Sequence, residues 1–151
     1  MAAISRSIDI AAPAEVVFAA ISDLARMGEF SPENTGGEWL RGARGPAVGA
    51  KFRGTNAQHG NEWKTTATIV TYLPPTEFAF EVTYGPLKVA RWSYSIVSTH
   101  AGCTLTESSL DRRSSLIKRF EKGTSNREEF TGTSIETTLA NVKAACEAAA
   151  Q

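Results

Sequence analysis

The most restrictive feature of this sequence is a run of strand-like segments followed by one long amphipathic helix. From residue 37 to about 110, short segments rich in Thr, Val, Tyr, Phe and Trp alternate with turn residues. From about Ser125 to Ala149, apolar residues recur instead at helical spacing, at Ile135, Leu139, Val142 and Cys146. A helix with one apolar stripe must bury that stripe against another element. We therefore expect this helix to lie against the concave face of a sheet.

Period-two alternation predicts six strands in this run and a further strand near the N-terminus. The clearest pattern is EFAFEVTY, in which Phe78, Phe80, Val82 and Tyr84 share one face of the strand. One face of the sheet is therefore expected to be buried and the other wet. The expected strands are residues 3–10, 38–42, 47–56, 62–73, 76–84, 88–98 and 102–110.

Two short helical segments are predicted between the first strand and the strand-rich run. Pro13 suits the first position of a helix, and Val17 and Ile21 fall on one face of it. Asp23 is placed to cap a second helical turn through Met27, before GEFSPENTGG ends it with Gly, Pro and Asn. Both helices are expected to be short.

The glycine-rich segment GARGPAVGAKFRG, residues 42–54, resembles a phosphate-binding loop at first sight. A P-loop requires four residues between its glycines and then Gly-Lys-Ser/Thr at the start of a helix. Here only three residues lie between Gly45 and Gly49, and Lys51 is followed by Phe52 in a strand-like stretch. Gly and Pro at this density are typical of turns and bends in a curved sheet. We interpret the segment as a hairpin with its turn at Gly45 and Pro46.

Composition and charge restrict the class of partner. The 151 residues suit a single domain over residues 1–151, and 16 basic residues balance 16 acidic ones. Because the net charge is zero, no overall electrostatic field attracts the protein to nucleic acid, and we expect no nucleic-acid partner. Because no apolar run reaches about 18 residues, we expect no stable membrane insertion. The two cysteines lack CxxC spacing and no Asn-x-Ser/Thr acceptor occurs, so we expect reduced thiols and a cytoplasmic protein.

The order of the elements resembles the SRPBCC or START-like superfamily, which includes the Bet v 1-like proteins. PAEVVFAAISDLARMGEFSPE, GGEWLRGARGPAVGAKFRG, ARWSYSIV and CTLTES are similar to its polyketide cyclase/dehydratase branch, and the likeness covers nearly the whole chain. The resemblance implies an α+β helix-grip fold, in which a seven-stranded curved antiparallel sheet wraps a long C-terminal helix, with two short helices after strand 1. It also implies a hydrophobic cavity between sheet and helix. We expect no cofactor. The branch has no universal catalytic motif.

Glu107 is the polar residue that the strand pattern marks most strongly. Its parity places it on the same face as Leu105, toward the expected cavity. A buried carboxylate must be paired or have its pKa raised. A raised pKa would suit a general acid or base, with Tyr94 or Tyr84 as its candidate catalytic partner. In the alternative, Glu107 is structural and reaches water or an arginine, for which Arg6 is a candidate.

Aromatic and aliphatic side chains supply candidate walls for a ligand site. Aromatic residues dominate core burial, so most of them are also expected in the core. A sheet wrapped around one helix nevertheless encloses more space than the small side chains of the helix stripe fill, and this mismatch favours a cavity. Tyr84, Trp92 and Tyr94 carry polar tips suited to orienting a mostly apolar ligand. The candidate ligand-binding residues are Trp39, Phe52, Trp63, Phe78, Phe80, Tyr84, Trp92, Tyr94, Leu105, Ile135 and Leu139.

Other kinds of site find little support in the sequence. His59 and His100 stand far apart, without carboxylates or thiols at ligand spacing, so we expect no metal site. The Gly-x-Ser-x-Gly motif of a nucleophilic serine is absent. His59 is expected at an exposed hairpin tip. The basic segment RRSSLIKRFEKG, residues 112–123, is either a solvated helix or a lid over the cavity mouth.

Three functions remain open on this basis. The first is a binding protein, monomeric or homodimeric, that holds a hydrophobic small molecule such as a lipid, polyketide or isoprenoid-like compound in the cavity. The second is a polyketide cyclase or dehydratase that uses acid–base catalysis. The third is a protein-interaction module, similar to antitoxins or chaperone cofactors, whose cavity is filled by side chains. An open cavity with polar residues in its wall would favour the first two.

Overall fold

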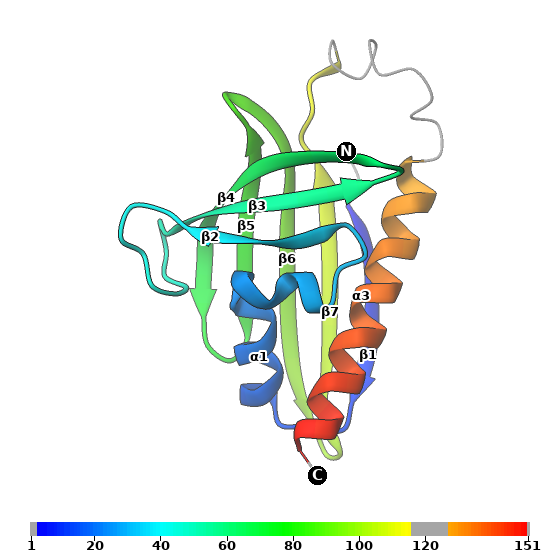
Figure 1. Ribbon diagram of the computed structural model, residues 1–151. Helices are drawn as coiled ribbons and strands as arrows, with labels where there is room; N and C mark the ends of the chain where they lie inside the picture. The colour runs from blue at the N-terminus through cyan, green and yellow to red at the C-terminus, as the bar shows by residue number, and fades with distance from the viewer. Residues whose placement is uncertain (1–2, 116–126, 151) are drawn as a thin grey trace.

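The computed structural model describes residues 3–115 and 127–150, and shows a bent sheet with a long helix along its inner side (Figure 1). The strands are β1 (Ile4–Ile10), β2 (Asn34–Trp39), β3 (Lys51–Gln58), β4 (Asn61–Leu73), β5 (Glu77–Tyr84), β6 (Leu87–Thr99) and β7 (Gly102–Asp111). The helix α1 (Ala14–Ser22) and the 3-10 helix η1 (Leu24–Glu29) follow β1, and α3 (Arg127–Ala149) is the last element. The predicted helix-grip fold is confirmed.

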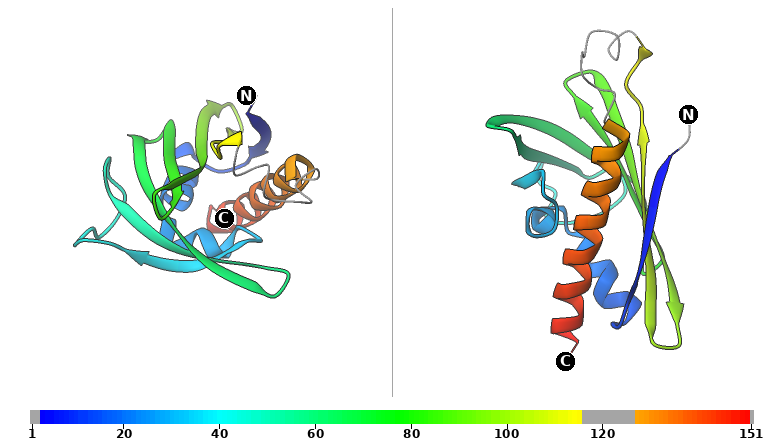
Figure 2. Two further views of the ribbon diagram at one scale, coloured as in Figure 1. Left: turned by 90° about the horizontal axis from the view of Figure 1, so that it is seen from above. Right: turned by 90° about the vertical axis from the view of Figure 1, so that its right-hand side faces the viewer.

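All seven strands pair antiparallel, in the order β1-β7-β6-β5-β4-β3-β2. The first strand therefore lies beside the last, and β1 and β2 form the two edges of the sheet. Seen from above, the sheet bends so that β2 and β3 run across the direction of β6 and β7 (Figure 2). Register shifts between Ile69 and Thr71 and between Val82 and Thr83 supply irregularities of the kind that bend strands. This curvature gives the sheet an inner face that can enclose space.

The apolar stripe of α3 packs into the core, as the spacing predicted. Ile135, Leu139, Val142 and Cys146 are each at most 2% exposed, and they share the core with residues of α1, η1 and the sheet. Burying a side chain of this size contributes about 1.5 to 3 kcal/mol to stability. The helix is also tied to the segment after η1, because the Asn141 Nδ2 donates to the Phe30 carbonyl at 2.8 Å.

Two strand boundaries differ from the prediction, both beside the glycine-rich segment. The strand expected at 38–42 is β2 and begins earlier, at Asn34, whereas the strand expected at 47–56 is β3 and begins only at Lys51. Gly49 has a positive φ of 89°, and the amide of Ala50 donates to the carbonyl of Ala47 at 3.0 Å. This turn interrupts the extended backbone, so Val48 is 66% exposed despite its apolar parity. The segment continues into a strand and not into the helix that a P-loop requires.

The remaining expectations concern the ends and tips of elements. Asp23 caps η1, because its Oδ1 accepts from the amide of Ala25 at 3.2 Å. His59 lies in the β3–β4 turn with a positive φ of 52°. Cys103 and Cys146 are buried free thiols. No helix in the described part of the chain is long and apolar enough to cross a membrane. Most of the basic segment, from residue 116 onward, lies outside the described residues, as does the expected start of the last helix.

Candidate functional site

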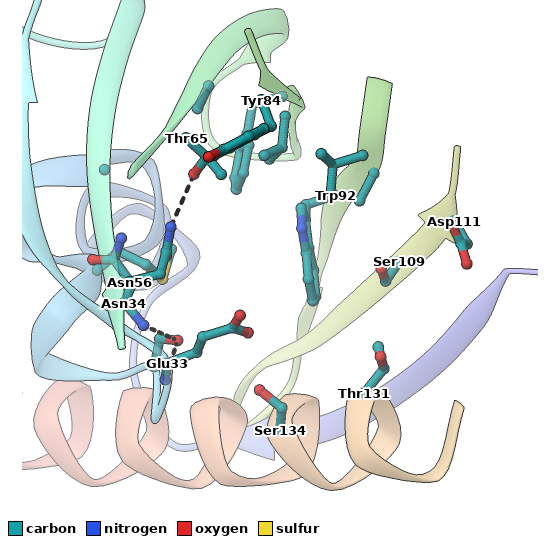
Figure 3. Close-up of a pocket in the computed structure, with 18 of the residues that line it drawn as sticks. Glu33, Asn34, Asn56, Thr65, Tyr84, Trp92, Ser109, Asp111, Thr131 and Ser134 are labelled. Atoms are coloured by element: carbon teal, nitrogen blue, oxygen red, sulfur yellow. Dashed lines mark hydrogen bonds between the residues drawn. The ribbon is translucent and has the colours of Figure 1, made fainter. Parts of the chain in front are cut away.

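A cavity of about 810 Å³ lies between the inner face of the sheet and α3 (Figure 3). This volume falls in the range of about 300 to 1,000 Å³ that is usual for small-molecule sites. Phe52, Ala67, Val82 and Ala90 are successive register partners across four strands, and all four line the cavity. The two alanines, together with Gly54, leave space beside the larger side chains. The protein-interaction alternative predicted a cavity filled by side chains. The observed cavity is not filled in this way.

Glu107 on β7 and Tyr94 on β6 form a buried hydrogen-bonded pair in the wall of this cavity. They are register partners in the antiparallel pair, so their side chains lie on the same face. The Tyr94 hydroxyl donates to Oε2 of Glu107 at 2.8 Å, and the residues are 4% and 3% exposed. The other carboxyl oxygen, Oε1, has no hydrogen-bond partner among the described residues. Because Glu107 lines the cavity, a bound molecule could satisfy this oxygen.

Burial controls the charge of this pair. Desolvation raises the pKa of Glu107 from its ordinary value of 4.5 to about 8, although the hydrogen bond from Tyr94 lowers it in part. Burial and the neighbouring carboxyl group also raise the pKa of Tyr94 well above its ordinary value. At neutral pH, Glu107 is therefore mostly protonated and Tyr94 is neutral. Pairing and a raised pKa, which the sequence presented as alternatives, occur together here.

Arg6, the arginine suggested as a partner of Glu107, binds another carboxylate. It lies opposite Glu107 in the β1–β7 register, but its Nε donates to Oε1 of Glu136 on α3 at 3.1 Å. Gly132 leaves room for the guanidinium in this position, since a Cβ at residue 132 would lie only 2.8 Å from Nη2 of Arg6. The Arg6 side chain stays 45% exposed, so its charge keeps much of its hydration. The suggested Arg6–Glu107 pair was wrong.

The inner face of β7 carries more polar groups beyond Glu107. Ser109 and Asp111 follow at the two-residue spacing of one strand face, and both line the cavity. Asp111 accepts two hydrogen bonds from the side chain of Arg113, from Nε to Oδ1 at 3.0 Å and from Nη2 to Oδ2 at 2.8 Å. Such a bidentate pair is geometrically well defined. Arg113 is only 7% exposed, so its guanidinium belongs to the wall and not to the outer surface.

Polar side chains also reach the cavity from two other directions. Ser134 and Thr138 line it from α3, where they are 8% and 4% exposed. Glu33, Asn34 and Asn56 line it from the β2–β3 side, opposite the β7 wall in Figure 3. The cavity is therefore apolar in large part but has polar groups on several walls. Within residues 3–115 and 127–150, no three His, Cys, Asp or Glu side chains are grouped to hold a metal ion.

Residues 1–147 match the family model described as "Polyketide cyclase / dehydrase and lipid transport". The chain belongs to this family. A solved relative, the polyketide cyclase-like protein Cgl2372 from Corynebacterium glutamicum, is 30% identical, with a TM-score of 0.65 over 97% of this chain and 92% of that one. No curated protein sequence matches the chain significantly.

Two more distant structures share the fold of this family member. The di-domain ARO/CYC protein StfQ from the steffimycin biosynthetic pathway has a TM-score of 0.76 at 13% identity, over 98% of this chain and 51% of StfQ. Ara h 8.0201 has a TM-score of 0.71 at 10% identity, over 97% of this chain and 98% of its own. Their likeness concerns the fold alone, and this chain spans about half of StfQ.

In this polyketide cyclase/dehydrase family member, the residues predicted to bind ligand fall into two sets. Those that line the cavity are Phe52, Trp63, Phe80, Tyr84, Trp92 and Tyr94. Those that do not are Trp39, Phe78, Leu105, Ile135 and Leu139. Trp39 packs edge-on against Phe52 at 5.2 Å between ring centroids, and the other four of the second set are buried in the core. Strand parity cannot separate the sets, because core and cavity lie on the same face of the sheet.

Most of the polar lining was missed by the sequence reasoning. Strand parity beyond Glu107 could have indicated Ser109 and Asp111. Ser134 and Thr138 each precede a stripe residue of α3 by one position, so a wider stripe would have included them. Glu33, Asn34 and Asn56 carry no local signal, because only the pairing of β2 with β3 brings them to the cavity.

Proposed function

We propose that this protein binds a mostly apolar small molecule, such as a lipid, polyketide or isoprenoid-like compound, in the cavity between the sheet and α3. The main support is a cavity of about 810 Å³ whose wall contains Oε1 of Glu107, a buried oxygen without a partner in the described part of the chain. Burial of apolar ligand surface would supply about 25 cal/mol per Å² before the costs of association. The family description, which names lipid transport beside cyclisation, agrees with such a role.

Ala90→Phe is expected to weaken binding in the cavity by about tenfold or more, because it places an aromatic ring in space that a ligand would occupy. Ala90 lines the cavity and is 9% exposed. The measurement is a fluorescence titration with Nile red, an uncharged apolar dye. Ala101→Phe is the matched control, since it adds the same ring at an exposed turn outside the cavity. Equal binding by both variants, each shown to be folded by circular dichroism, would contradict the proposal. As a separate test of the binding proposal, native mass spectrometry of the purified protein would search for a co-purified apolar molecule.

A second candidate function, acid–base catalysis, is favoured by Glu107 itself. Its pKa of about 8 lies near physiological pH, where a carboxyl group can both give and take a proton. Tyr94 holds Oε2, so Oε1 is the oxygen that would exchange the proton with a bound ketone. A cyclase or dehydratase needs this exchange at the carbon beside the carbonyl group. Tyr84, the alternative catalytic tyrosine, is 54% exposed and lines the cavity, and its hydroxyl makes no hydrogen bond to Glu107.

Glu107→Gln should reduce proton exchange beside the carbonyl of a bound methyl ketone by about 100-fold or more, if this second function holds. Glutamine keeps the shape of the side chain but cannot transfer the proton. The measurement is deuterium uptake by the methyl group of acetylnaphthalene in D2O, followed by NMR with and without protein. Uptake that the wild type does not accelerate, while the ketone is bound, would remove the catalytic role and leave the binding role.

A further inference from the structure

The unpartnered oxygen of Glu107 has a defined chemical character. Oε2 accepts the hydrogen bond from the Tyr94 hydroxyl, as the carbonyl-type oxygen of a carboxylic acid does. When the group is protonated, the hydrogen then lies on Oε1, the oxygen in the cavity wall without a partner in the described chain. A buried carboxylic acid in this state is a hydrogen-bond donor, and an unsatisfied buried donor favours a ligand that brings an acceptor.

We propose that the cavity selects ligands whose polar end is an uncharged hydrogen-bond acceptor, a ketone or aldehyde oxygen bound by Glu107, and discriminates against ligands that end in a carboxylate. This inference rests on the proposed binding function and names the ligand class that the same site takes. It separates neutral carbonyl compounds from fatty acids and other organic acids, although both are mostly apolar.

Among residues 3–115 and 127–150, the groups around Glu107 provide no cation for an anionic ligand. Its strand neighbours offer Tyr94 on β6 and, on β1, Arg6, whose guanidinium is bound to Glu136. β7 itself adds Ser109 and Asp111, and α3 adds the hydroxyls of Ser134 and Thr138. The raised pKa of Glu107 agrees with this arrangement, since burial raises it, the Tyr94 hydrogen bond lowers it only in part, and no charged neighbour in the described chain contributes.

Neither of the two basic residues in the described cavity lining serves Glu107. One is bound to another carboxylate, and the other is distant from the Glu107–Tyr94 pair. Arg113 holds Asp111 through two hydrogen bonds. Lys88 is exposed and lies six positions from Tyr94 along β6, which corresponds to about 20 Å of strand. The same lining also contains the acidic residues Glu33, Glu107 and Asp111. The described wall is therefore better suited to neutral groups than to anions.

A carboxylate ligand could share the Glu107 proton, but the shared pair would still carry one negative charge. That charge would lie in a desolvated wall with no nearby cation in the described part of the chain, which is costly. A ketone oxygen accepts the same hydrogen bond without bringing a charge. The ketone should therefore bind about tenfold more tightly or better. A tenfold ratio of affinities requires a free-energy difference no larger than that of one modest interaction.

The test compares two ligands with the same apolar body, acetylnaphthalene and the naphthoate with the same ring position. Displacement of Nile red, checked by isothermal titration calorimetry, would be measured at about pH 6.5, where naphthoate is ionised and Glu107 is protonated. We expect the ketone to bind at least about tenfold more tightly. Equal affinities, tighter naphthoate binding, or no measurable ketone binding while Nile red binds would each overturn the inference.

Variants at position 107 identify the donor. Glu107→Gln offers an amide N–H in place of the acid and should keep the preference for the ketone to within about threefold. Glu107→Leu removes the donor and should lose most of that preference. In the wild type, ketone affinity should fall as pH rises through about 8, because the ionised carboxylate cannot donate, whereas the glutamine variant should show a flat profile. A wild-type profile as flat as that of the glutamine variant would contradict the assignment to Glu107.

The outcomes also separate this inference from the proposed function. If Nile red and both naphthalene compounds bind equally to wild type and Ala90→Phe, the cavity is not the binding site and the proposed function fails. If Ala90→Phe blocks both naphthalene compounds but their affinities are the same, binding in the cavity stands and only the selectivity for an uncharged acceptor is wrong.

Discussion

Glu107→Gln is expected to make the protein more stable than the wild type at pH 8 and equally stable at about pH 4.5. The pKa of Glu107 is about 8 in the folded protein and near 4.5 when exposed, so the folded chain binds more protons between these values. Wild-type stability contributed by this group is therefore present in full below pH 4.5 and is lost as pH rises to about 8. The shift corresponds to several kcal/mol, with about 5 kcal/mol as an upper bound. Glutamine, which does not ionise, avoids this loss.

Urea unfolding of both proteins at a series of pH values measures this effect as a difference, in which the titration of other groups cancels. Tyr94→Phe supplies the control for the mechanism. The Tyr94 hydrogen bond lowers the pKa of Glu107, so its loss should extend the pH range of destabilisation upward. Parallel stability curves for wild type and Glu107→Gln would show that Glu107 ionises in the folded protein without penalty, and a buried acid donor would then be excluded.

Phe78→Ala is expected to lower the free energy of unfolding by about 3 to 5 kcal/mol, the usual cost of removing a buried phenylalanine. Phe78 is 1% exposed and does not line the cavity. Its ring contacts four other aromatic rings at 5.7 to 6.5 Å between centroids, those of Phe18, Tyr72, Phe80 and Tyr94. The side chain therefore supports the cavity wall from the core, and its removal would leave a void among these rings.

Trp92→Ala is the matched comparison, because Trp92 is half-buried and lines the cavity. It should cost less stability than Phe78→Ala but weaken Nile red binding more, when both are measured at a temperature where each variant is folded. Phe78→Leu, which keeps much of the volume, should fall between wild type and Phe78→Ala in urea unfolding. Loss of binding in Phe78→Ala without loss of stability would instead make Phe78 part of the ligand wall, as the sequence predicted.

Local patterns were sufficient for most of the fold. The alternation in EFAFEVTY identified β5, and the spacing of Ile135, Leu139, Val142 and Cys146 identified the buried stripe of α3, because both signals depend only on side-chain periodicity. The boundaries near residues 34–51 were less well predicted. There, the start of β2 depends on pairing with β3, and the start of β3 depends on the turn at Gly49.

The sequence by itself determined the inward face of most strands, which includes Glu107 and Tyr94, since period two is a property of any strand. Val48 departs from its parity because of the turn at Gly49. Only the tertiary structure decided which inward residues pack into the core and which line a cavity, because that depends on the distance between the sheet and α3. It also decided the partner of Glu107. The register set Tyr94 and Arg6 on either side of it, but Arg6 could keep its hydration by binding Glu136 past Gly132, whereas the Tyr94 hydroxyl was already buried beside the carboxyl group.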